Sequence, residues 1–465
     1  MNTVRKLSYL AFVGLCSCST PAIEPADRQL LSKPGLFPAY NASANLCEAV
    51  PVNDQSAQVL APIDKPKYLS PYTDPSFGTR IIRVSNSSSG DVHKPLYSTI
   101  QSWNADESLL MLFQRGFNNS GYVLLDGHTY EPRGRLNINP ADVEEVFWSR
   151  FDPNRLFYVS RSRGSESQFF SYDTASGRRS LIKDLAPMCR SGSVARSGGD
   201  VYMQSLDDDL FGFRCETSGG SYRLFSYRIS TDELTAVTAK EGNDWNEWTA
   251  PMPSPSGRSM WLQGDIVNPQ LNSVQRKLDL AKPGEHGDLG LGHDGQDTLY
   301  QTVFDPSPGG CDGAADRGVG HLGIHNLNTG KCRAMLTESE GWPYTTSGTH
   351  VSAGAYKQPG WVVLSSIGYR EQLPFLENQQ PATPLFSEIY VVNTNPNNPQ
   401  VCRVAHHRSY GKFAKKGGYP AYFGEPHPSH SPSGTRVVFG SDWQDSGAVD
   451  AYVVELPSYK PPASR

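Results

Sequence analysis

The sequence predicts an all-β protein, a seven-bladed β-propeller closed by an N-terminal strand that joins the last blade. Three observations predict this fold: a composition rich in turn-forming and aromatic residues, a turn-and-strand unit that recurs seven times, and no helical periodicity of useful length after residue 67. The 465 residues include 43 glycines and 35 prolines, and 11% of all residues are aromatic. Turn formers combined with aromatic strand formers are typical of many short strands. This composition argues against a helical bundle and against intrinsic disorder.

The recurring unit is a tight turn followed by an aromatic or β-branched strand. In each copy Pro, Gly, Asn or Asp supplies the backbone geometry of the turn. One turn residue taken from each copy gives spacings between 39 and 73 residues, and a four-stranded propeller blade needs roughly 40–50 residues before loop insertions. The clearest copies begin at Asn104, Phe151, Ser254 and Ser431, and weaker copies begin at Arg196, Asp294 and Gln358. Further turns at Ser171–Gly177 and Asn326–Gly330 are expected to join the outer strands of a blade.

The two ends of the propeller are expected to meet in one blade. Thr79–Val84 is predicted to add a strand to the last blade, beside Ala451–Glu455, because this pairing hides the exposed sheet edges. The propeller is therefore predicted to span residues 67–457, with a short tail at 458–465. The alternative is a pair of β-sandwich domains, but no linker is visible inside residues 67–457.

The amino terminus has the pattern of a bacterial export signal. Arg5 and Lys6 precede the apolar run Leu10–Leu15, which is too short for a permanent membrane span. Leu15-Cys16-Ser17-Cys18 resembles a lipobox, so we expect a lipoprotein signal peptide at residues 1–18 and lipidation of Cys18; an ordinary secretory peptide is the alternative. A serine at position 19 suggests the outer membrane, with the protein facing the periplasm or the cell surface. The proline-rich residues 19–66 are expected to form an extended tether.

Charge and cysteine content narrow the class of protein. There are 42 Lys and Arg against 47 Asp and Glu, a formal charge of −5, which argues against a general nucleic-acid binder. Six cysteines remain after the leader, and an oxidising compartment allows them to form disulfides. Cys189 with Cys215 and Cys311 with Cys332 are the pairs nearest in sequence, but the connectivity stays open.

Two familiar catalytic patterns do not describe this chain. There is no Gly-x-Ser-x-Gly motif, so a serine hydrolase is not predicted. Gly290–Gly295 matches the dinucleotide-binding fingerprint by letters only, because no strand precedes it and no helix follows it, and it is interpreted as a turn.

Histidines are concentrated just ahead of the predicted turns, on the approach to the innermost strand of each blade. There they are expected to surround the central cavity, where a ring of imidazoles could bind a divalent metal or supply a base. The alternative is that each histidine is hydrogen-bonded separately within its own blade. The residues concerned are His93, His286, His293, His350, His406, His407, His427 and His430.

Six short motifs resemble those of the secreted seven-bladed propeller polysaccharide lyases, the superfamily of oligogalacturonate lyases and propeller-type ulvan lyases. They are Glu285-His-Gly-Asp288, Thr349-His-Val-Ser352, Ala405-His-His-Arg408, Pro426-His-Pro-Ser-His430, His93-Lys-Pro-Leu-Tyr97 and Ser102-Trp-Asn-Ala-Asp106. The resemblance covers nearly all of residues 67–457. It implies cleavage of a uronic-acid-containing polysaccharide, sulfated and ulvan-like polymers included, by β-elimination. Separately, because no later stretch reaches 18 apolar residues, we expect the chain to touch the membrane only through its anchor, and we expect a monomer. A non-catalytic propeller lipoprotein that binds glycan or scaffolds an envelope complex is the alternative.

The resemblance also suggests site residues. His93 matches the family's first-blade histidine and is expected to act as base or acid, with Tyr158 as its partner unless Tyr158 is only a core aromatic. Cations that neutralise the uronate carboxylate are expected among Arg115, Arg161, Arg190 and Arg214, with Tyr97 and Trp248 as further substrate contacts. A divalent metal (Zn, Ca or Mn) is expected at His286, His350, His407 and His427, with Cys402 in reserve. The lyases commonly carry a second histidine about 20 residues after the first, where this chain reads Leu112-Phe-Gln-Arg-Gly116.

Overall fold

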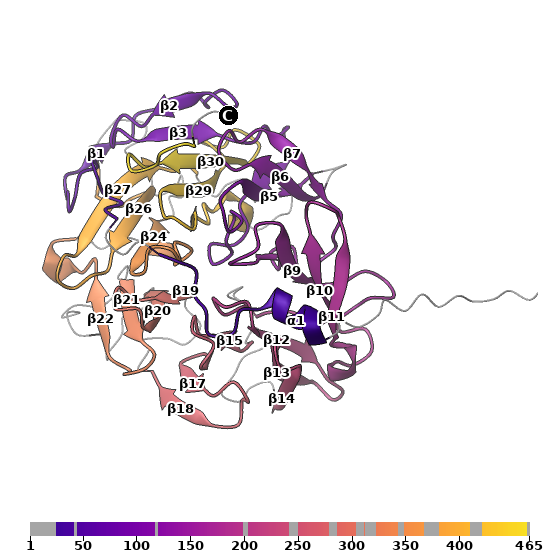
Figure 1. Cartoon of the computed structure of the whole chain (residues 1–465). Helices are drawn as coiled ribbons and strands as arrows, with labels where there is room; N and C mark the ends of the chain where they lie inside the picture. Colours follow the sequence, from indigo (N-terminus) through magenta and orange to yellow (C-terminus); the bar gives the residue numbers. More distant parts are fainter. Residues whose placement is uncertain are drawn as a thin grey trace, which may run out of the picture.

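The structure, a computed structural model, is an all-β seven-bladed propeller, as predicted. It describes residues 25–40, 44–116, 120–198, 203–240, 250–278, 286–303, 311, 322–342, 348–366, 381–409 and 421–462. Seven antiparallel sheets are arranged radially around a central axis (Figure 1). Each sheet is one blade, and its first strand lies nearest the axis.

Blades 1 to 3 follow one another along the chain. Blade 1 consists of β4 (Val92–Lys94), β5 (Leu109–Arg115), β6 (Gly121–Asp126) and β7 (Pro132–Leu136). Blade 2 consists of β8 (Phe147–Trp148), β9 (Arg155–Val159), β10 (Gln168–Asp173) and β11 (Arg179–Asp184). Blade 3 consists of β12 (Leu210–Glu216), β13 (Ser221–Arg228) and β14 (Glu233–Lys240), with single bridges from Arg196 and Gln204 on its axial side.

Blades 4 to 6 repeat the pattern. Blade 4 consists of β15 (Met252–Pro253), β16 (Met260–Leu262), β17 (Asp265–Val267) and β18 (Val274–Lys277). Blade 5 consists of β19 (Gly287–Leu291), β20 (Asp297–Thr302), β21 (Leu322–Asn326) and β22 (Cys332–Met335). Blade 6 consists of β23 (Gly348–Ser352), β24 (Trp361–Ser366), β26 (Glu388–Asn393) and β27 (Gln400–His406).

Blade 7 closes the ring by combining both ends of the chain. It contains β28 (Ser429–His430), β29 (Arg436–Ser441) and β30 (Asp450–Glu455), to which β3 (Arg80–Arg83) and β2 (Pro71–Thr73) are added at the outer edge. β3 pairs antiparallel with β30, with Ile81 opposite Val454, and both side chains are buried. The predicted closure is therefore confirmed, and it satisfies the edge of β30 that would otherwise be exposed.

The recurring turn joins the first and second strands of a blade. Gly257, Gly295 and Gly434 occupy the left-handed region in these turns, with φ of 67°, 73° and 74°, which glycine adopts without steric cost. One predicted copy is misplaced: the corresponding turn of blade 3 lies at Ser205–Asp209, where Ser205 N–H bonds to the Leu210 carbonyl, and not at the turn predicted after Arg196. Three consecutive aspartates supply this turn, which has neither the Pro-Ser-Gly of the Ser254 and Ser431 copies nor the Asp-Gly of the Asp294 copy.

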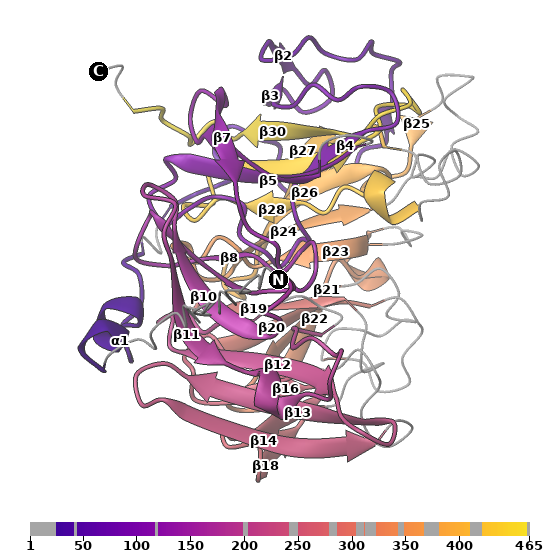
Figure 2. The same ribbon diagram turned by 90° about the vertical axis from the view of Figure 1, so that its right-hand side faces the viewer.

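The described part of the segment before the propeller packs against the blades. α1 (Pro25–Leu31) lies at one end of the ring, at the left in Figure 2, where Arg28 forms an ion pair with Asp232. Leu46 is fully buried. The short strand β1 (Gln58–Val59) pairs with β25 (Pro381–Ala382). Apolar burial and pairing therefore hold these residues against the blades.

Three disulfides reinforce the ring. The predicted pairs Cys189–Cys215 and Cys311–Cys332 are both present, and Cys47 pairs with Cys402. The third bond fixes the segment before the propeller to β27. Because the sulfur of Cys402 is in a disulfide, it does not serve as a reserve metal ligand. None of the described helices has the length and apolarity to cross a membrane.

Candidate active site

The first strands of the blades all begin at the same end of the ring. In blades 1, 5 and 6 the first and second strands are antiparallel, so the beginning of the first strand pairs with the end of the second. Val92 pairs in this way with Arg115, and Gly287 with Gln301. α1 lies at the opposite end, where Arg28 contacts Tyr227 near the end of β13 and Asp232 in the turn between β13 and β14. Residues just before or at the start of the first strands therefore share one end of the axis, which we call the histidine end.

Three histidines from blades 5, 6 and 7 meet at the histidine end. The ring centroids of His286 and His350 lie 4.9 Å apart, and those of His350 and His427 lie 4.3 Å apart. His350 and His427 are fully buried. We call His286, His350 and His427 the histidine cluster. It brings together three of the four residues predicted to bind metal.

Glu425 completes a group of metal-ligand atoms with two of these histidines. One carboxylate oxygen of Glu425 lies 3.5 Å from Nε2 of His350 and 3.5 Å from Nε2 of His427. One potential ligand atom from each residue lies within 4.8 Å of the others. Burial raises the pKa of Glu425 to about 6, so its carboxylate is ionised at neutral pH.

The residues fit a divalent cation. Burial holds the pKa of His350 and of His427 well below the usual value, so both imidazoles are neutral and each carries one nitrogen lone pair. Neither ring nitrogen of His350 has a hydrogen-bond partner among the described residues, nor does Nε2 of His427. Buried polar atoms without partners are costly, and a cation would satisfy them. Two imidazoles and one carboxylate suit Zn, Mn or Fe better than Ca, which prefers oxygen ligands alone.

A tyrosine from blade 1 is joined to the cluster. The hydroxyl of Tyr97 and Nδ1 of His286 share a hydrogen bond of 2.7 Å, and the Tyr97 ring meets His350 and His427 edge-on. Burial lowers the pKa of His286 to about 4, so this imidazole is neutral and can accept a proton. Tyr97, predicted as a substrate contact, thus lies beside three predicted metal ligands.

A second tyrosine, Tyr422, lies beside the cluster, with its ring centroid 4.5 Å from that of His427. Tyr422 stacks on Tyr97 at a centroid distance of 6.5 Å, and its hydroxyl donates a hydrogen bond to the carboxylate of Glu144. Burial raises the pKa of Glu144 to about 7, so a large fraction of this group carries a proton at neutral pH. The phenol of Tyr422 also has a pKa raised well above the usual value by burial.

Lys94 supplies a positive charge under the cluster. Its Nζ lies 2.9 Å from Nδ1 of His427 and donates hydrogen bonds to the carbonyl oxygens of Tyr422 and Glu425. Burial lowers the pKa of Lys94 to about 8, although the carboxylates of Glu144 and Glu425 favour its charged form. The ammonium form donates to Nδ1 of His427 and so leaves the imidazole proton on Nε2. If Nε2 were to hold a cation, Nδ1 would carry the proton and Lys94 would accept its hydrogen bond as a neutral amine.

His93 does not join this site. It is adjacent to Lys94 in β4, and successive strand residues point to opposite faces of a sheet. His93 instead lines a separate cavity of about 340 Å³ that includes Tyr68, Gln114 and Arg135. His93 is therefore outside the histidine cluster, and its sequence neighbour Lys94 is the β4 residue that contacts His427.

His407 is also separate from the cluster. Its Nε2 and the carbonyl oxygen of Ser366 share a hydrogen bond of 2.6 Å, while Nδ1 accepts one from the Ser409 backbone N–H at 3.0 Å. With both ring nitrogens occupied, His407 has no lone pair for a metal. Its role in this structure is to hold together the ends of β24 and β27.

Other predicted residues lie elsewhere. Tyr158 is buried in β9 and stacks on Phe170, as a core aromatic would. The Arg115 guanidinium lies over the Phe423 ring, next in sequence to Tyr422. Trp248 and Cys18 lie outside the described residues.

Arg161, Arg190 and Arg214 come together away from the histidine cluster, in a pocket of about 310 Å³ between blades 2 and 3. We call this the arginine pocket. Its lining residues are Ala141, Arg161, Arg190, Gly192, Ser193, Val194, Arg196, Arg214, Cys215 and Glu216.

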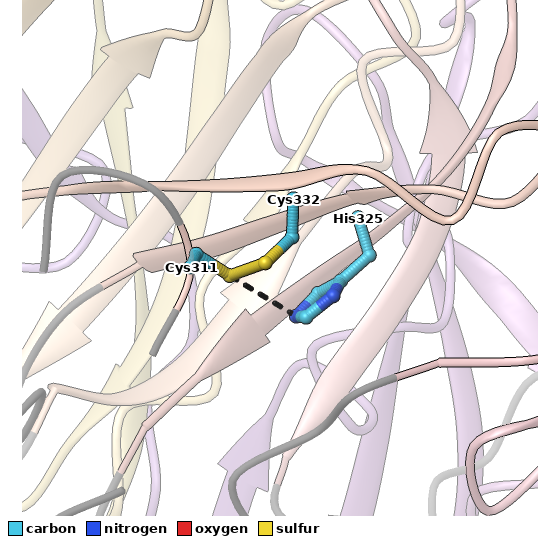
Figure 3. Close-up of side chains that lie close together, drawn as sticks. All are labelled: Cys311, His325 and Cys332. Carbon is cyan, nitrogen blue, oxygen red and sulfur yellow. Dashed lines mark hydrogen bonds between the residues drawn. A yellow bond between two sulfur atoms is a disulfide. The ribbon is translucent and has the colours of Figure 1, made fainter. Parts of the chain in front are cut away.

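A second group of potential ligands, outside the histidine end, is not a metal centre in this state. Cys311, Cys332 and His325 lie close together, and Nε2 of His325 is 3.9 Å from the Cys311 sulfur (Figure 3). The two sulfur atoms are joined in a disulfide, so neither is a thiolate ligand. This group stabilises blade 5.

Sequence reasoning missed four members of the site: Lys94, Glu144, Tyr422 and Glu425. Lys94 lies within the quoted motif His93–Tyr97, and Glu425 immediately precedes the quoted motif Pro426–His430. The acidic residue Glu425, two positions before His427, was a signal from which a further metal ligand could have been predicted. Glu144 and Tyr422 belong to segments without a motif, and only the closed ring brings them together.

The fold and site thus define a seven-bladed propeller whose closed ring brings histidines, tyrosines, a lysine and two glutamates together, with His350, His427 and Glu425 placed so that they could hold a metal ion. No family model matches the chain, and a search of curated proteins finds no match. Among solved structures, the chain is similar to an oligogalacturonate lyase from Vibrio parahaemolyticus, with 16% sequence identity and a TM-score of 0.59 over 84% of this chain and 97% of that one. It is similar to an oligogalacturonate lyase in complex with manganese, with 16% identity and a TM-score of 0.59 over 87% and 99% of the two chains. At this identity the likeness establishes the fold alone.

Proposed function

We propose that this protein is a polysaccharide lyase that cleaves a uronic-acid-containing saccharide by β-elimination at the histidine end. The observation that carries the proposal is that two neighbouring tyrosines have chemically different partners. Tyr97 is hydrogen-bonded to a neutral imidazole, which can accept a proton, and Tyr422 to a carboxyl group of raised pKa, which can supply one. Groups whose surroundings push their pKa values apart are the usual arrangement for a base and an acid in one site. The likeness to oligogalacturonate lyases supports the same class of substrate.

The Tyr97–His286 pair is the proton acceptor in this proposal. The hydrogen at C5 of a uronate is weakly acidic because it is next to the carboxylate. The hydroxyl of Tyr97 passes its proton to Nδ1 of His286 and accepts the C5 proton in its place. The low pKa of His286 keeps the imidazole neutral before the reaction.

The Tyr422–Glu144 pair is the proton donor. Its role is to protonate the glycosidic oxygen as the C4–O bond breaks. Because burial keeps Tyr422 protonated and raises the pKa of Glu144 to about 7, the pair holds a transferable proton at neutral pH. The C5–H and C4–O bonds break, the C4–C5 double bond forms, and one proton is taken up while another is supplied, so the step needs no redox partner and no water.

Positive charge must stabilise the carboxylate while the C5 proton leaves. Without a bound cation, the ammonium group of Lys94, which lies within hydrogen-bond distance of His427, supplies this charge. His350, His427 and Glu425 would hold a divalent cation, for which manganese is our first candidate, and such a cation would neutralise the developing charge. Glu425 and His286 are the partly exposed members, so we infer that substrate approaches from their side.

The test is an assay for the unsaturated uronyl product on a panel of pectic, ulvan, alginate and glycosaminoglycan substrates, with and without a chelator. The double bond conjugated to the carboxylate absorbs in the ultraviolet, so turnover appears directly as absorbance. We expect turnover on at least one uronate polymer and its loss in Tyr97→Phe. Saccharide binding without product on every polymer would favour the non-catalytic alternative. The proposed substrates include sulfated, ulvan-like polymers. We also propose an outer-membrane lipid anchor at Cys18, which labelling with a lipid precursor would test.

A further inference from the structure

We propose that the arginine pocket is a separate anion subsite, which binds a carboxylate or sulfate group on another sugar of the chain whose uronate reaches the histidine cluster. This inference rests on the proposed function for the identity of the chain. Four arginines and one glutamate give the pocket lining a formal charge of +3. The volume of about 310 Å³ is enough for a sugar-sized group.

Two of the arginines are held directly opposite each other. Arg196 and Arg214 exchange both backbone hydrogen bonds, at 2.9 and 2.7 Å, so they form a directly paired cross-strand position. Like charges at such a position repel each other and destabilise the sheet. An anion bound between their guanidinium groups would be attracted by both positive charges.

The buried arginine is fixed in position before any ligand binds. Arg214 is only 2% exposed, and its guanidinium lies 4.3 Å from the centre of the Tyr222 ring. A guanidinium presents a rigid planar set of donors that matches the oxygens of a carboxylate or sulfate. Holding that plane against an aromatic ring lowers the entropy lost when an anion binds.

A disulfide fixes the rest of the pocket. Cys189–Cys215 joins the residue before Arg190 to the residue after Arg214. Arg190 is in turn paired with Glu216, the only carboxylate among the described lining residues, through Nε at 2.9 Å. The Arg190–Ser193 turn contains Gly192 at φ 84°, where a Cβ would be strained. The donors are therefore arranged in advance of binding.

The arginine pocket and the histidine cluster are joined by one short piece of chain. Ala141 lines the pocket, and Glu144 contacts Tyr422 in the proposed active site. Three residues of fully extended chain span at most about 11 Å. Arg161 and Arg190 are exposed at the rim, so the pocket is open to solvent. A saccharide chain can then occupy both places with neighbouring sugars.

The test compares binding of three matched hexasaccharides: hexagalacturonate, neutral maltohexaose and sulfated maltohexaose. Calorimetry is carried out on the full chain carrying Tyr97→Phe, so that turnover does not deplete the ligand. We expect hexagalacturonate or the sulfated hexamer to bind and maltohexaose not to bind. Arg196→Gln should weaken anion binding by about 10- to 100-fold, the loss of one charge-assisted hydrogen bond, and Arg161→Gln by about 10-fold. Arg178→Gln, an exposed arginine in the turn between β10 and β11, is the matched control and should leave the affinity unchanged.

The outcomes separate this inference from the proposed function. If the chain carrying Tyr97 turns over a uronate polymer while Arg161→Gln and Arg196→Gln leave both KM and hexamer affinity unchanged, the subsite is refuted and the lyase proposal stands. If no polymer is cleaved but anionic hexamers bind and depend on both arginines, the subsite stands and the lyase proposal fails. Arg161 is exposed, so its variant should fold normally even if Arg196→Gln does not.

Discussion

The hydroxyl of Tyr97 and Nδ1 of His286, which are 189 positions apart in the sequence, lie 2.7 Å from each other on the axis of the propeller. Tyr97 comes from blade 1 and His286 from the start of blade 5, so this contact exists only when the ring is closed. It joins a phenol to a neutral imidazole, and the proposed chemistry depends on this pair.

Removing the Tyr97 hydroxyl should abolish most of the turnover. Tyr97→Phe keeps the ring that meets His350 and His427 but removes the group that accepts the C5 proton. We expect kcat to fall by about 10²- to 10⁴-fold, as for loss of a general base, with little change in KM. Tyr158→Phe is the control, because Tyr158 is a core aromatic in blade 2. Equal loss of kcat in both variants would contradict the assignment.

A divalent cation should stabilise the native protein through His350, His427 and Glu425. Manganese at about 100 times its Kd should raise the free energy of unfolding by about 2.7 kcal/mol, measured by thermal melting with and without a chelator. His427→Asn should lose this response. Asparagine is the suitable replacement because His427 has φ 41°, a left-handed conformation that asparagine tolerates better than most residues.

His407→Gln is the control for the metal experiment, because both ring nitrogens of His407 are hydrogen-bonded outside the cluster. It should keep the full response to manganese. A response lost in His407→Gln and kept in His427→Asn would place the metal elsewhere.

The adjacent residues His93 and Lys94 should behave differently when replaced. Lys94→Met removes the ammonium group near His427, so we expect kcat/KM to fall by at least about 10-fold on protein shown by melting to be folded. His93→Gln changes a separate cavity and should leave kcat/KM within about 2-fold. The reverse order of effects would restore His93 as the residue of the first blade that acts in catalysis.

Stability should fall as the pH is lowered below 6.5. Burial lowers the pKa of His407 from 6.5 to about 4, so the unfolded chain binds more protons than the folded chain between these values. The stability from His407 is therefore complete above pH 6.5 and is lost as the pH falls toward 4. From about pH 7.5 to about pH 5 this group alone should cost the wild type roughly 2 kcal/mol. Denaturant titrations should show a correspondingly smaller pH dependence in His407→Gln, and an unchanged one would count against the neutral, buried imidazole.

The fold was largely predictable because its signals are local. Turns built from Pro, Gly, Asn or Asp, such as that at Ser431, recur from blade to blade, and Thr79–Val84 has the β-branched pattern of a strand that needs a partner. The exception at Arg196 has the same explanation: blade 3 makes its turn with Asp207, Asp208 and Asp209, which do not resemble the other copies.

The site was predictable only in part, because it depends on which face a side chain takes. His286, His350 and His427 were found because they occupy equivalent places in their blades. His93 and Lys94 are adjacent, and a motif containing both does not show which one faces the axis, since a shift of one residue reverses the face. The arrangement of Arg196 opposite Arg214 depends on strand register across 18 residues, which spacing alone does not reveal.

The most direct test of the account is cleavage of a uronate polymer in water enriched in heavy oxygen, with the products weighed by mass spectrometry. Elimination adds no water across the glycosidic bond, so the account predicts a new non-reducing end with a C4–C5 double bond and no oxygen at C4, lighter by one water than the end that hydrolysis leaves. Incorporation of heavy oxygen into the new ends, without an unsaturated product, would show hydrolysis and contradict the central claim.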